Sequence, residues 1–319
     1  MSARTPAVFN ASWLMEQDFP PIKYVVPGII PEGMTLLVAS PKIGKSWMVL
    51  GLALDLHAGR DAFGSIPVGR PRPVFYLALE DGPRRLQDRI RILKPIEINT
   101  NLTFNVSVPA DDVVATIRNY LATHDGQDAV VILDTLGKVM PSSGSKTQYA
   151  ADYDFLGALK STCDAVPGSS LIIVHHTRKL GGEDFLDAVS GTNGIAGSAD
   201  TVLVLKRDRQ AQDGTLHVTS RDAHEGEYAV NLTDGRWTLV GGSIQDAARA
   251  AQTAQQTSGV GDRMADIITV IGRYEEGISV QDIKVLLPNI PVGQVDTYLK
   301  RAVEAERIVR TSRGRYAPV

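Results

Sequence analysis

The stretch Ala39-Ser40-Pro41-Lys42-Ile43-Gly44-Lys45-Ser46 decides how this chain folds. An apolar run at 34–38 predicts a buried strand before it, and an apolar run at 47–56 predicts a helix after it. A strand, a tight loop ending in Gly-Lys-Ser and a helix are the parts of the phosphate-binding loop of nucleoside triphosphatases. We therefore expect backbone N–H groups and the helix N-terminus to surround a phosphate, with residues from Ser40 to Trp47 at the nucleotide.

Two side chains of this loop have separate expected roles. Lys45 is predicted to reach the β- and γ-phosphates of ATP, and the Ser46 hydroxyl is predicted to bind Mg²⁺. The usual pattern G-x-x-x-x-G-K-S begins with glycine, and this chain has Ala39 there. We interpret Ala39 as a tolerated variant, because alanine fits wherever the backbone keeps strand dihedrals. The alternative is a chance match in a strand-to-helix turn.

Composition limits the class of protein. The chain has 319 residues, which favours one large domain and a small one, and its 43% hydrophobic and 22% charged residues are typical of a globular protein. We expect no membrane segment and no signal peptide, and the single cysteine, Cys163, excludes an internal disulfide. These features predict a cytoplasmic protein. The net charge of −3 is no nucleic-acid signature, so any DNA contact must come from local patches.

Short apolar runs alternate with helical segments up to about residue 205, which predicts an α/β fold with a mainly parallel sheet and antiparallel edge strands. The ATPase core is expected at 23–241, after an N-terminal arm at 1–22. The expected strands are 35–39, 74–79, 129–133, 170–174 and 201–205, then 216–220, 228–232 and 237–240 on the antiparallel edge; the expected helices are 47–58, 84–93, 110–123 and 149–163.

The chain changes character after residue 241. Residues 242–259 are rich in Ala, Gln, Ser and Thr, which predicts a partly helical linker. Residues 260–319 predict three short helices, the second opening at Ile278, followed by a hairpin, and so resemble a winged helix-turn-helix domain. Its basic residues favour DNA contact, although a solvated surface or a protein-docking winged helix would have them too. They are Lys300, Arg301, Arg307, Arg310, Arg313 and Arg315.

Two strands are each expected to end in a carboxylate. Asp134 follows one apolar run and is predicted to hold Mg²⁺. Glu80 follows another and is our candidate for the base or water-orienting group near the γ-phosphate. Asp81 is the second candidate, expected instead to cap the helix that starts near Pro83. The alternative is that both Glu80 and Asp81 are helix caps.

A histidine pair ends a further strand. Adjacent residues leaving a strand point to opposite sides, so His175 and His176 are not expected to share a metal, and Cys163 is the only thiol that could complete a zinc site. A polar residue at this strand end can instead hydrogen-bond the γ-phosphate and report its loss to nearby loops. We assign that sensor role to the pair, with His176 preferred.

The order of these motifs resembles that of the RecA-like ATPases, most closely the RepA-type hexameric helicases of plasmids and phages (AAA_25-like). The resemblance covers about residues 23–241. Its matching segments are SPKIGKSW at 40–47, LALEDGPRRLQDRI at 77–90, VVILDT at 130–135 and VHHTRK at 174–179.

The resemblance implies a homo-oligomeric ring, usually of six subunits, with ATP bound between neighbours and single-stranded DNA in the central channel. It also implies a replication role with an initiation or primase partner. The loops at 138–148 and 178–197 would move the DNA, and the alternative is surface loops without DNA contact. Lys138, Lys146, Arg178 and Lys179 could contact phosphates, although Glu183, Asp184 and Asp187 weaken this expectation.

Such a ring also implies a cation that reaches the neighbour's site. The candidates are Lys206, Arg207, Arg209 and Arg221. Arg221 is nearest to the helicase pattern, although Thr219 stands where that pattern often has lysine. The resemblance also places Arg89 near the base of the nucleotide, and the alternative is an exposed arginine on a helix. Together these features predict a DNA helicase, and the alternative is an ATP switch that binds DNA without unwinding it, such as a regulator or recombination mediator.

Overall fold

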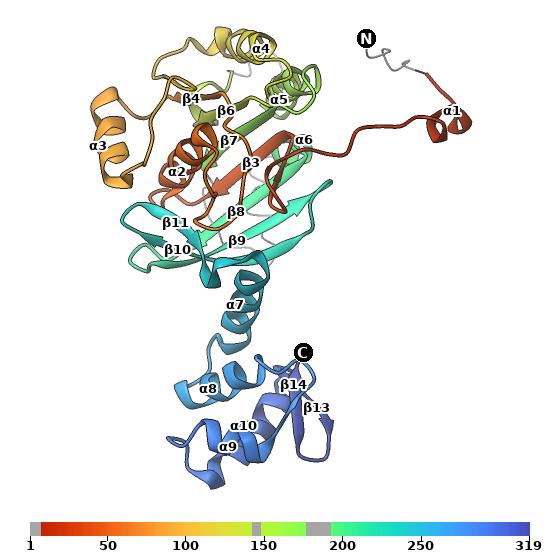
Figure 1. The fold of residues 1–319 in the computed structure, drawn as a ribbon, viewed down its shortest axis with the longest axis vertical. Helices are drawn as coiled ribbons and strands as arrows, with labels where there is room; N and C mark the ends of the chain where they lie inside the picture. Colours follow the sequence, from red (N-terminus) through yellow and green to blue (C-terminus); the bar gives the residue numbers. More distant parts are fainter. Residues whose placement is uncertain (1–7, 142–147, 177–192) are drawn as a thin grey trace.

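A computed structural model gives the fold of the chain (Figure 1) and describes residues 8–141, 148–176 and 193–319. Most of the predicted loop at 178–197, and with it Arg178, Lys179, Glu183, Asp184 and Asp187, lies outside the described residues, as does Lys146. Within the described ranges, no helix has the length and apolar character needed to cross a membrane.

A mixed sheet forms the centre of the molecule, and among the described residues it has nine strands in the order β11-β10-β9-β8-β3-β7-β6-β4-β5. The part from β8 to β5 is parallel, and β9, β10 and β11 continue it as an antiparallel extension. The strands are β3 (Gly33–Ala39), β4 (Val74–Ala78), β5 (Leu102–Asn105), β6 (Val130–Asp134), β7 (Ser170–His176), β8 (Thr201–Arg207), β9 (Asp213–Ser220), β10 (Gly226–Thr233) and β11 (Arg236–Leu239).

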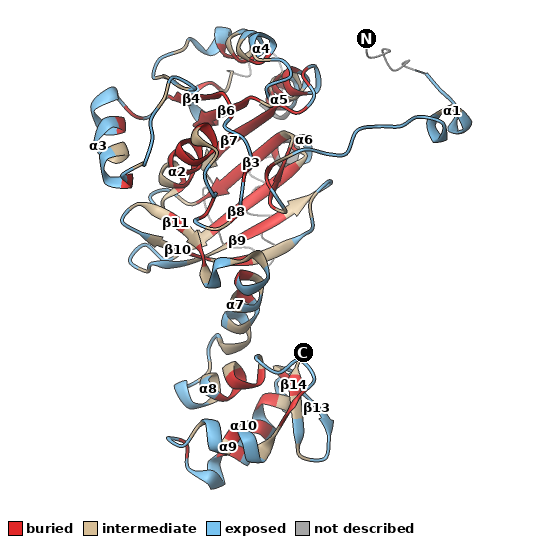
Figure 2. Ribbon diagram, viewed as in Figure 1, coloured by how far each residue is buried: buried red, intermediate tan, exposed pale blue. Residues whose placement is uncertain are grey.

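Helices cover both faces of this sheet. Alternate residues of β3 enter different cores: Leu37 and Ala39 pack with α2, and Leu36 and Val38 pack with α4 and α5. The central strands are therefore buried on both faces (Figure 2), which explains their continuous apolar runs. The helices are α2 (Lys45–Ala58) and α3 (Pro83–Leu93) on one face, and α4 (Val113–Thr123), α5 (Gln148–Asp164) and α6 (Asn193–Ser198) on the other.

Several elements differ from the sequence prediction. The helix expected from residue 110 begins with a 3-10 turn, η1 (Ala110–Asp112), and a second such turn, η2 (Leu136–Lys138), follows β6. The edge strand β5 was not expected; it is short and only partly buried, so its apolar signal is weak. The N-terminal region adds α1 (Ala11–Met15) and a small ladder of β1 (Tyr24–Val26) with β2 (Ile30–Pro31).

The segment predicted as a linker is largely one helix. After the turn η3 (Val240–Gly242), α7 (Ile244–Thr257) begins with the Ser243 hydroxyl accepting a hydrogen bond from Asp246 N. Ala247 is fully buried in the same core as α2, so α7 packs on the sheet at β10. Figure 1 shows this helix between the sheet and the C-terminal unit.

The C-terminal unit has its own hydrophobic core. The sequence prediction of a helix opening at Ile278 is wrong by two residues: Ile278 and Ser279 form a short strand, and Ser279 then caps the helix by accepting from Asp282 N. The three strands of this unit pair in the order β12-β14-β13. Its elements are α8 (Asp262–Ile271), β12 (Ile278–Ser279), α9 (Val280–Leu286), α10 (Val292–Glu304), β13 (Ile308–Ser312) and β14 (Arg315–Pro318).

Candidate active site

The phosphate-binding loop (residues 40–46) joins the end of β3 to α2. Ala39 is the last residue of β3 and is fully buried, so alanine occupies a strand position there. Gly44 is the N-cap of α2 with φ of 106°, a conformation that glycine adopts without the strain imposed by a side chain. A small pocket of about 220 Å³ opens beside the loop. It is lined by Lys42, Gly44, Lys45, Ser46, Trp47, Arg89, His176, Arg207 and Leu232.

Lys45 is buried at the mouth of the loop, with 4% of its surface exposed. Its Nζ donates to Ala39 O at 2.6 Å and to Ser40 O at 2.9 Å. Burial lowers the pKa of the ammonium to about 8, although Asp134 and Glu80 act in the opposite direction. The two backbone carbonyls therefore hold a poorly solvated cation where an incoming phosphate would neutralise it.

Asp134 ends β6 and is 2% exposed. Tyr76, fully buried on β4, donates its hydroxyl to Asp134 Oδ2 at 2.8 Å, and Oδ1 is buried with no hydrogen-bond partner among the described residues. Burial raises the pKa of this carboxyl, and interactions with Tyr76 and the Ser46 hydroxyl partly oppose the rise. A buried, unpaired carboxylate oxygen near a serine hydroxyl is a fitting donor set for Mg²⁺, which prefers oxygen ligands.

Glu80 and His176 face each other across the ends of β4 and β7. His176 Nε2 lies 3.5 Å from Glu80 Oε2, and both side chains are more than a third exposed. His176 pairs in register with Ala39 and lines the pocket, whereas His175 pairs with Val38 and lies on the opposite face of the sheet. Burial lowers the pKa of His175, with His176 and Lys45 contributing. The structure thus brings only His176 together with Glu80 at the pocket.

Asp81 is not the helix cap that the sequence predicts. The N-cap of α3 is Gly82, with no side-chain cap, and the Asp81 carboxylate instead pairs with Arg85 at 3.0 Å and with Arg89. Arg85 and Arg89 of α3 therefore bind a carboxylate that is only 7% exposed. Arg89 also lies over the Trp47 ring, with its Cζ 5.3 Å from the centroid, which places it at the pocket.

Two of the four cations predicted to act on a neighbour, Arg207 and Arg221, lie at opposite ends of the sheet. Arg207 ends β8 beside the phosphate-binding loop of its own chain and donates from Nε to Ile43 O at 3.0 Å. Arg221 follows β9, which runs antiparallel, and so lies at the amino ends of β3 and β8. The 7-residue β3 is roughly 20 Å long. Arg221 is therefore out of reach of its own loop.

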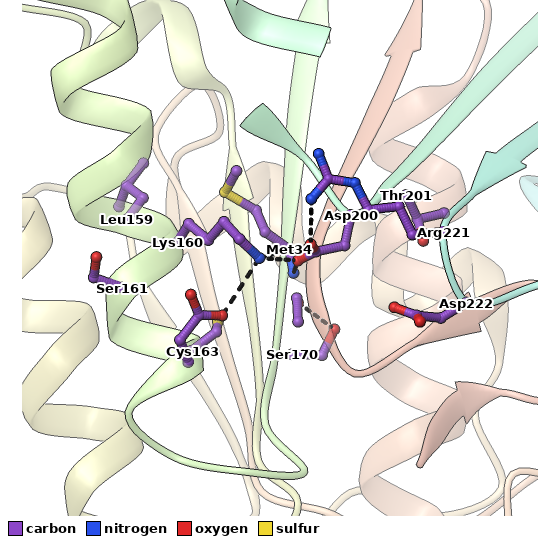
Figure 3. A network of polar contacts seen from close by, with 12 residues as sticks. Met34, Leu159, Lys160, Ser161, Cys163, Ser170, Asp200, Thr201, Arg221 and Asp222 are labelled. Atoms are coloured by element: carbon purple, nitrogen blue, oxygen red, sulfur yellow. Dashed lines mark hydrogen bonds and ion pairs between the residues drawn. The ribbon is translucent and has the colours of Figure 1, made fainter. Parts of the chain in front are cut away.

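Arg221 belongs to a polar network around Asp200 (Figure 3). Its Nη1 lies 3.8 Å from Asp200 Oδ1, and its side chain is 64% exposed. Asp200 also accepts from Lys160 Nζ at 2.5 Å and from Met34 N at 3.0 Å, so α5, β3 and the start of β8 meet at this carboxylate. The network fixes the amino end of the sheet and leaves Arg221 facing outward.

Sequence reasoning missed three residues with structural roles: Tyr76 and Trp237 at the site, and Asp200 at the amino end of the sheet. Tyr76 lies within an apolar run, where only its hydroxyl signals the need for a buried partner. Trp237, on β11, donates from Nε1 to Gly44 O at 3.0 Å, a contact across 193 residues that no local pattern indicates. Asp200 precedes β8 with no motif around it. A larger cavity of about 1030 Å³ beside α7 and α8 is lined by none of the residues predicted for the nucleotide site, although Arg315 borders it.

The order of the sheet, the loop between β3 and α2, and acidic groups at the ends of β4 and β6 define a P-loop ATPase of RecA-like fold. The model of the AAA_25 family, described as an AAA domain, matches residues 2–182, more than half of the chain. The chain belongs to this family and is an ATP-hydrolysing enzyme.

Solved structures share the fold at low sequence identity. One of them, described as an ATPase domain, matches with a TM-score of 0.51 and 13% identity, covering 65% of this chain and 84% of that one. A DnaB-like replicative helicase, in a structure that describes its interactions with primase, matches with a TM-score of 0.52 and 14% identity, covering 65% of this chain and 57% of that one. The C-terminal unit lies outside the family match.

Proposed function

We propose that the chain is a Mg²⁺-dependent ATPase that moves along single-stranded DNA as a ring and unwinds duplexes during replication of a plasmid, phage or prophage. The observation that carries the proposal is the convergence of Lys45, Asp134, Glu80 and His176 at the carboxyl ends of adjacent strands. The descriptions of the structural neighbours, one of them a replicative helicase, agree with this activity.

Within that proposal each group of the site has a separate task. Lys45 and the backbone N–H groups of the loop bind the β- and γ-phosphates, and Glu80 orients the attacking water and accepts its proton. Ser46 and Asp134 Oδ1 would hold Mg²⁺, which when bound neutralises charge on the phosphates. His176, 3.5 Å from Glu80, is placed to detect the loss of the γ-phosphate. His175 would support it from the far side of the strand.

A neighbouring subunit would complete the site. Arg221 is exposed and distant from its own loop, as a group that acts on another subunit must be. The arm at 8–22 supports self-association, because Phe9, Met15 and Phe19 are 46%, 83% and 53% exposed. Deletion of residues 1–22 is expected to reduce the oligomer, measured by light scattering after size exclusion. An unchanged mass of the oligomer would show that the arm is not needed for assembly.

The C-terminal unit is proposed as a winged helix, supported by its order of helices and strands. Four of its six predicted DNA-contacting cations have partners within the chain. Arg307 donates to Ser258 O at 3.0 Å, Arg315 to Gly277 O at 2.7 Å and Arg310 to Ser312 O at 3.3 Å, and Lys300 lies 3.8 Å from Glu304. Arg310 and Arg313 on the hairpin stay exposed. Their joint replacement by alanine should weaken DNA binding and reduce its salt dependence if the unit contacts DNA, and should change neither if it docks protein.

The test of the main proposal uses two assays on the full chain. ATP turnover is measured with and without single-stranded DNA, and unwinding is measured on a forked duplex with Mg²⁺. We expect DNA to stimulate turnover and the fork to open. Robust turnover without unwinding would overturn the helicase proposal and favour the ATP switch, whereas soluble, cytoplasmic expression is expected in either case.

A further inference from the structure

We infer that Trp237 and Arg207 hold the phosphate-binding loop in its phosphate-binding conformation, and that both are positioning residues for ATP hydrolysis within their own chain. They come from β11 and β8, which lie after the segment that carries the catalytic groups. The inference rests on ATP binding at this loop.

The two side chains bind consecutive carbonyls of the loop. Arg207 Nε donates to Ile43 O at 3.0 Å, and Trp237 Nε1 donates to Gly44 O at 3.0 Å. The Arg207 guanidinium also donates to Ala211 O and lies over the Trp237 ring, with Cζ 5.8 Å from the centroid. Trp237 is 4% exposed, and both hydrogen bonds to the loop are partly buried.

Planar peptide geometry turns these contacts into an orientation of the loop. In a trans peptide the N–H points opposite to the C=O of the same plane. Anchoring Ile43 O on Arg207 therefore directs the N–H of Gly44 the other way. Gly44 O accepts from Met48 N of α2 at 3.0 Å as well as from Trp237, and the two donors together direct the N–H of Lys45 away from them. These are the N–H groups that a phosphate-binding loop presents to its anion. The loop is thus ordered before nucleotide binds.

Steric fit supports the same assignment. A Cβ on Gly44 would lie 3.1 Å from Trp237 Cζ2 and 3.3 Å from Leu232 Cδ2, at a φ of +106°. Trp237 and Leu232 therefore leave little room for a side chain at the glycine of the Gly-Lys-Ser motif, whose backbone conformation also favours glycine. The hairpin of β10 and β11 is itself tied to α2, because Arg236 Nη1 binds Asp55 Oδ1 at 3.0 Å. The contact to Gly44 is held by a rigid element.

The geometry also separates Arg207 from Arg221. The Arg207 guanidinium serves two carbonyls of its own chain, whereas Arg221 is exposed at the other end of the sheet. An arginine that acts on a neighbour affects the transition state, and one that orders a binding loop affects ground-state and transition-state binding alike. The two roles therefore predict different kinetic signatures.

Trp237→Phe in the full chain tests the inference, because it keeps an aromatic ring in the core and removes the indole N–H that donates to Gly44 O. We expect the Kd for a fluorescent ATP analogue and the KM for ATP to rise by about threefold to tenfold, the range for one lost hydrogen bond. The matched control is Tyr228→Phe on β10, a buried aromatic that loses one polar atom away from the loop. It should change neither constant.

Arg207→Lys keeps the positive charge and loses the planar guanidinium that donates to two carbonyls. It should give the same rise in the KM for ATP. Thermal unfolding of each nucleotide-free variant shows that the measurements are made on folded protein. Unchanged Kd in folded Trp237→Phe would overturn the inference alone, and absence of ATP binding by the unaltered chain would overturn it together with its premise. Recovery of turnover when Arg207→Ala subunits are mixed with Lys45→Ala subunits would show that Arg207 acts on a neighbour and would also overturn it.

Discussion

Glu80 and Asp81 are adjacent carboxylates with opposite environments. Asp81 is buried, and each of its carboxylate oxygens is paired with an arginine of α3. Glu80 is exposed, and a basic group of the described residues, His176, lies 3.5 Å from its carboxylate and lines the pocket. Both residues lie in the short connection between the end of β4 at Ala78 and the start of α3 at Pro83, and only Asp81 meets the arginines of α3.

Glu80→Gln is expected to reduce kcat by about 10²- to 10⁴-fold, because an amide can neither accept a proton nor carry the charge that orients the water. ATP binding, measured by calorimetry, should stay close to that of the unaltered chain, since Glu80 is not a phosphate ligand. Asp81→Asn makes the same chemical change one residue further on. It should lower thermal stability by unpairing Arg89 and retain most of the turnover. Normal hydrolysis by Glu80→Gln would refute the assignment of Glu80 as the base.

Lys45 predicts a pH dependence of nucleotide binding. Its pKa is lowered to about 8 by burial, so the ammonium is half deprotonated near pH 8 in the free protein. Phosphate binding favours the charged form of Lys45. The protein should therefore take up about half a proton per site when ATP binds at pH 8, and its affinity for ATP should fall about tenfold per pH unit above that. Below pH 7 this group should leave the affinity flat.

Calorimetry at pH 8 in two buffers with different ionisation enthalpies measures this proton uptake. Lys45→Arg is the control, because a guanidinium stays charged at these pH values. In Lys45→Arg the binding enthalpy should no longer depend on the buffer, whatever the affinity of this variant for ATP. Equal binding enthalpies in the two buffers for the unaltered chain would contradict the lowered pKa.

Among the elements, the buried parallel strands could be predicted because each is a continuous apolar run ending in a polar group. Ala39, Glu80, Asp134 and His176 lie at or just after the ends of these strands, so much of the candidate site could also be predicted from the sequence. The edge strand β5 and the role of the β10–β11 hairpin could not be. The hairpin acts through contacts between residues distant in the chain, such as Trp237 with Gly44, and periodicity reports only a residue's local environment.

Gly235→Ala tests how closely the hairpin fits the site. Gly235 has φ of +79°, and a Cβ there would lie 2.4 Å from the Trp47 ring. Gly242 is the matched control, with φ of +78° and open space around it. Each alanine should cost about 1 kcal/mol for the left-handed backbone, and Gly235→Ala should cost about 1–3 kcal/mol more for the clash. Denaturant unfolding measures both. Equal losses would mean that the hairpin shifts away from Trp47 without cost.

In the whole molecule, α7 joins two separate hydrophobic cores. Its buried side, at Ala247, belongs to the core of the sheet, and the core of the C-terminal unit contains no residue of α7. The Ile244 side chain packs on Gly28, where a Cβ would lie 2.9 Å from Ile244 Cδ1. The helix α7 in the segment 242–259 thus packs as part of the ATPase domain. The sequence did not indicate this packing, because most residues of the helix are small or polar.

Two truncated chains test that boundary. A chain ending at residue 241 loses α7 and exposes the surface under Ile244 and Ala247, which should cost about 2–3 kcal/mol by the area removed from water. For a domain of this size the loss corresponds to a Tm roughly 5–10 °C lower. A chain ending at residue 258 keeps these contacts and should melt with the ATPase domain of the full chain. Calorimetry on the three proteins makes the comparison, and basal ATP turnover confirms that each is folded. Equal melting temperatures for the two truncated chains would place the end of the domain before α7.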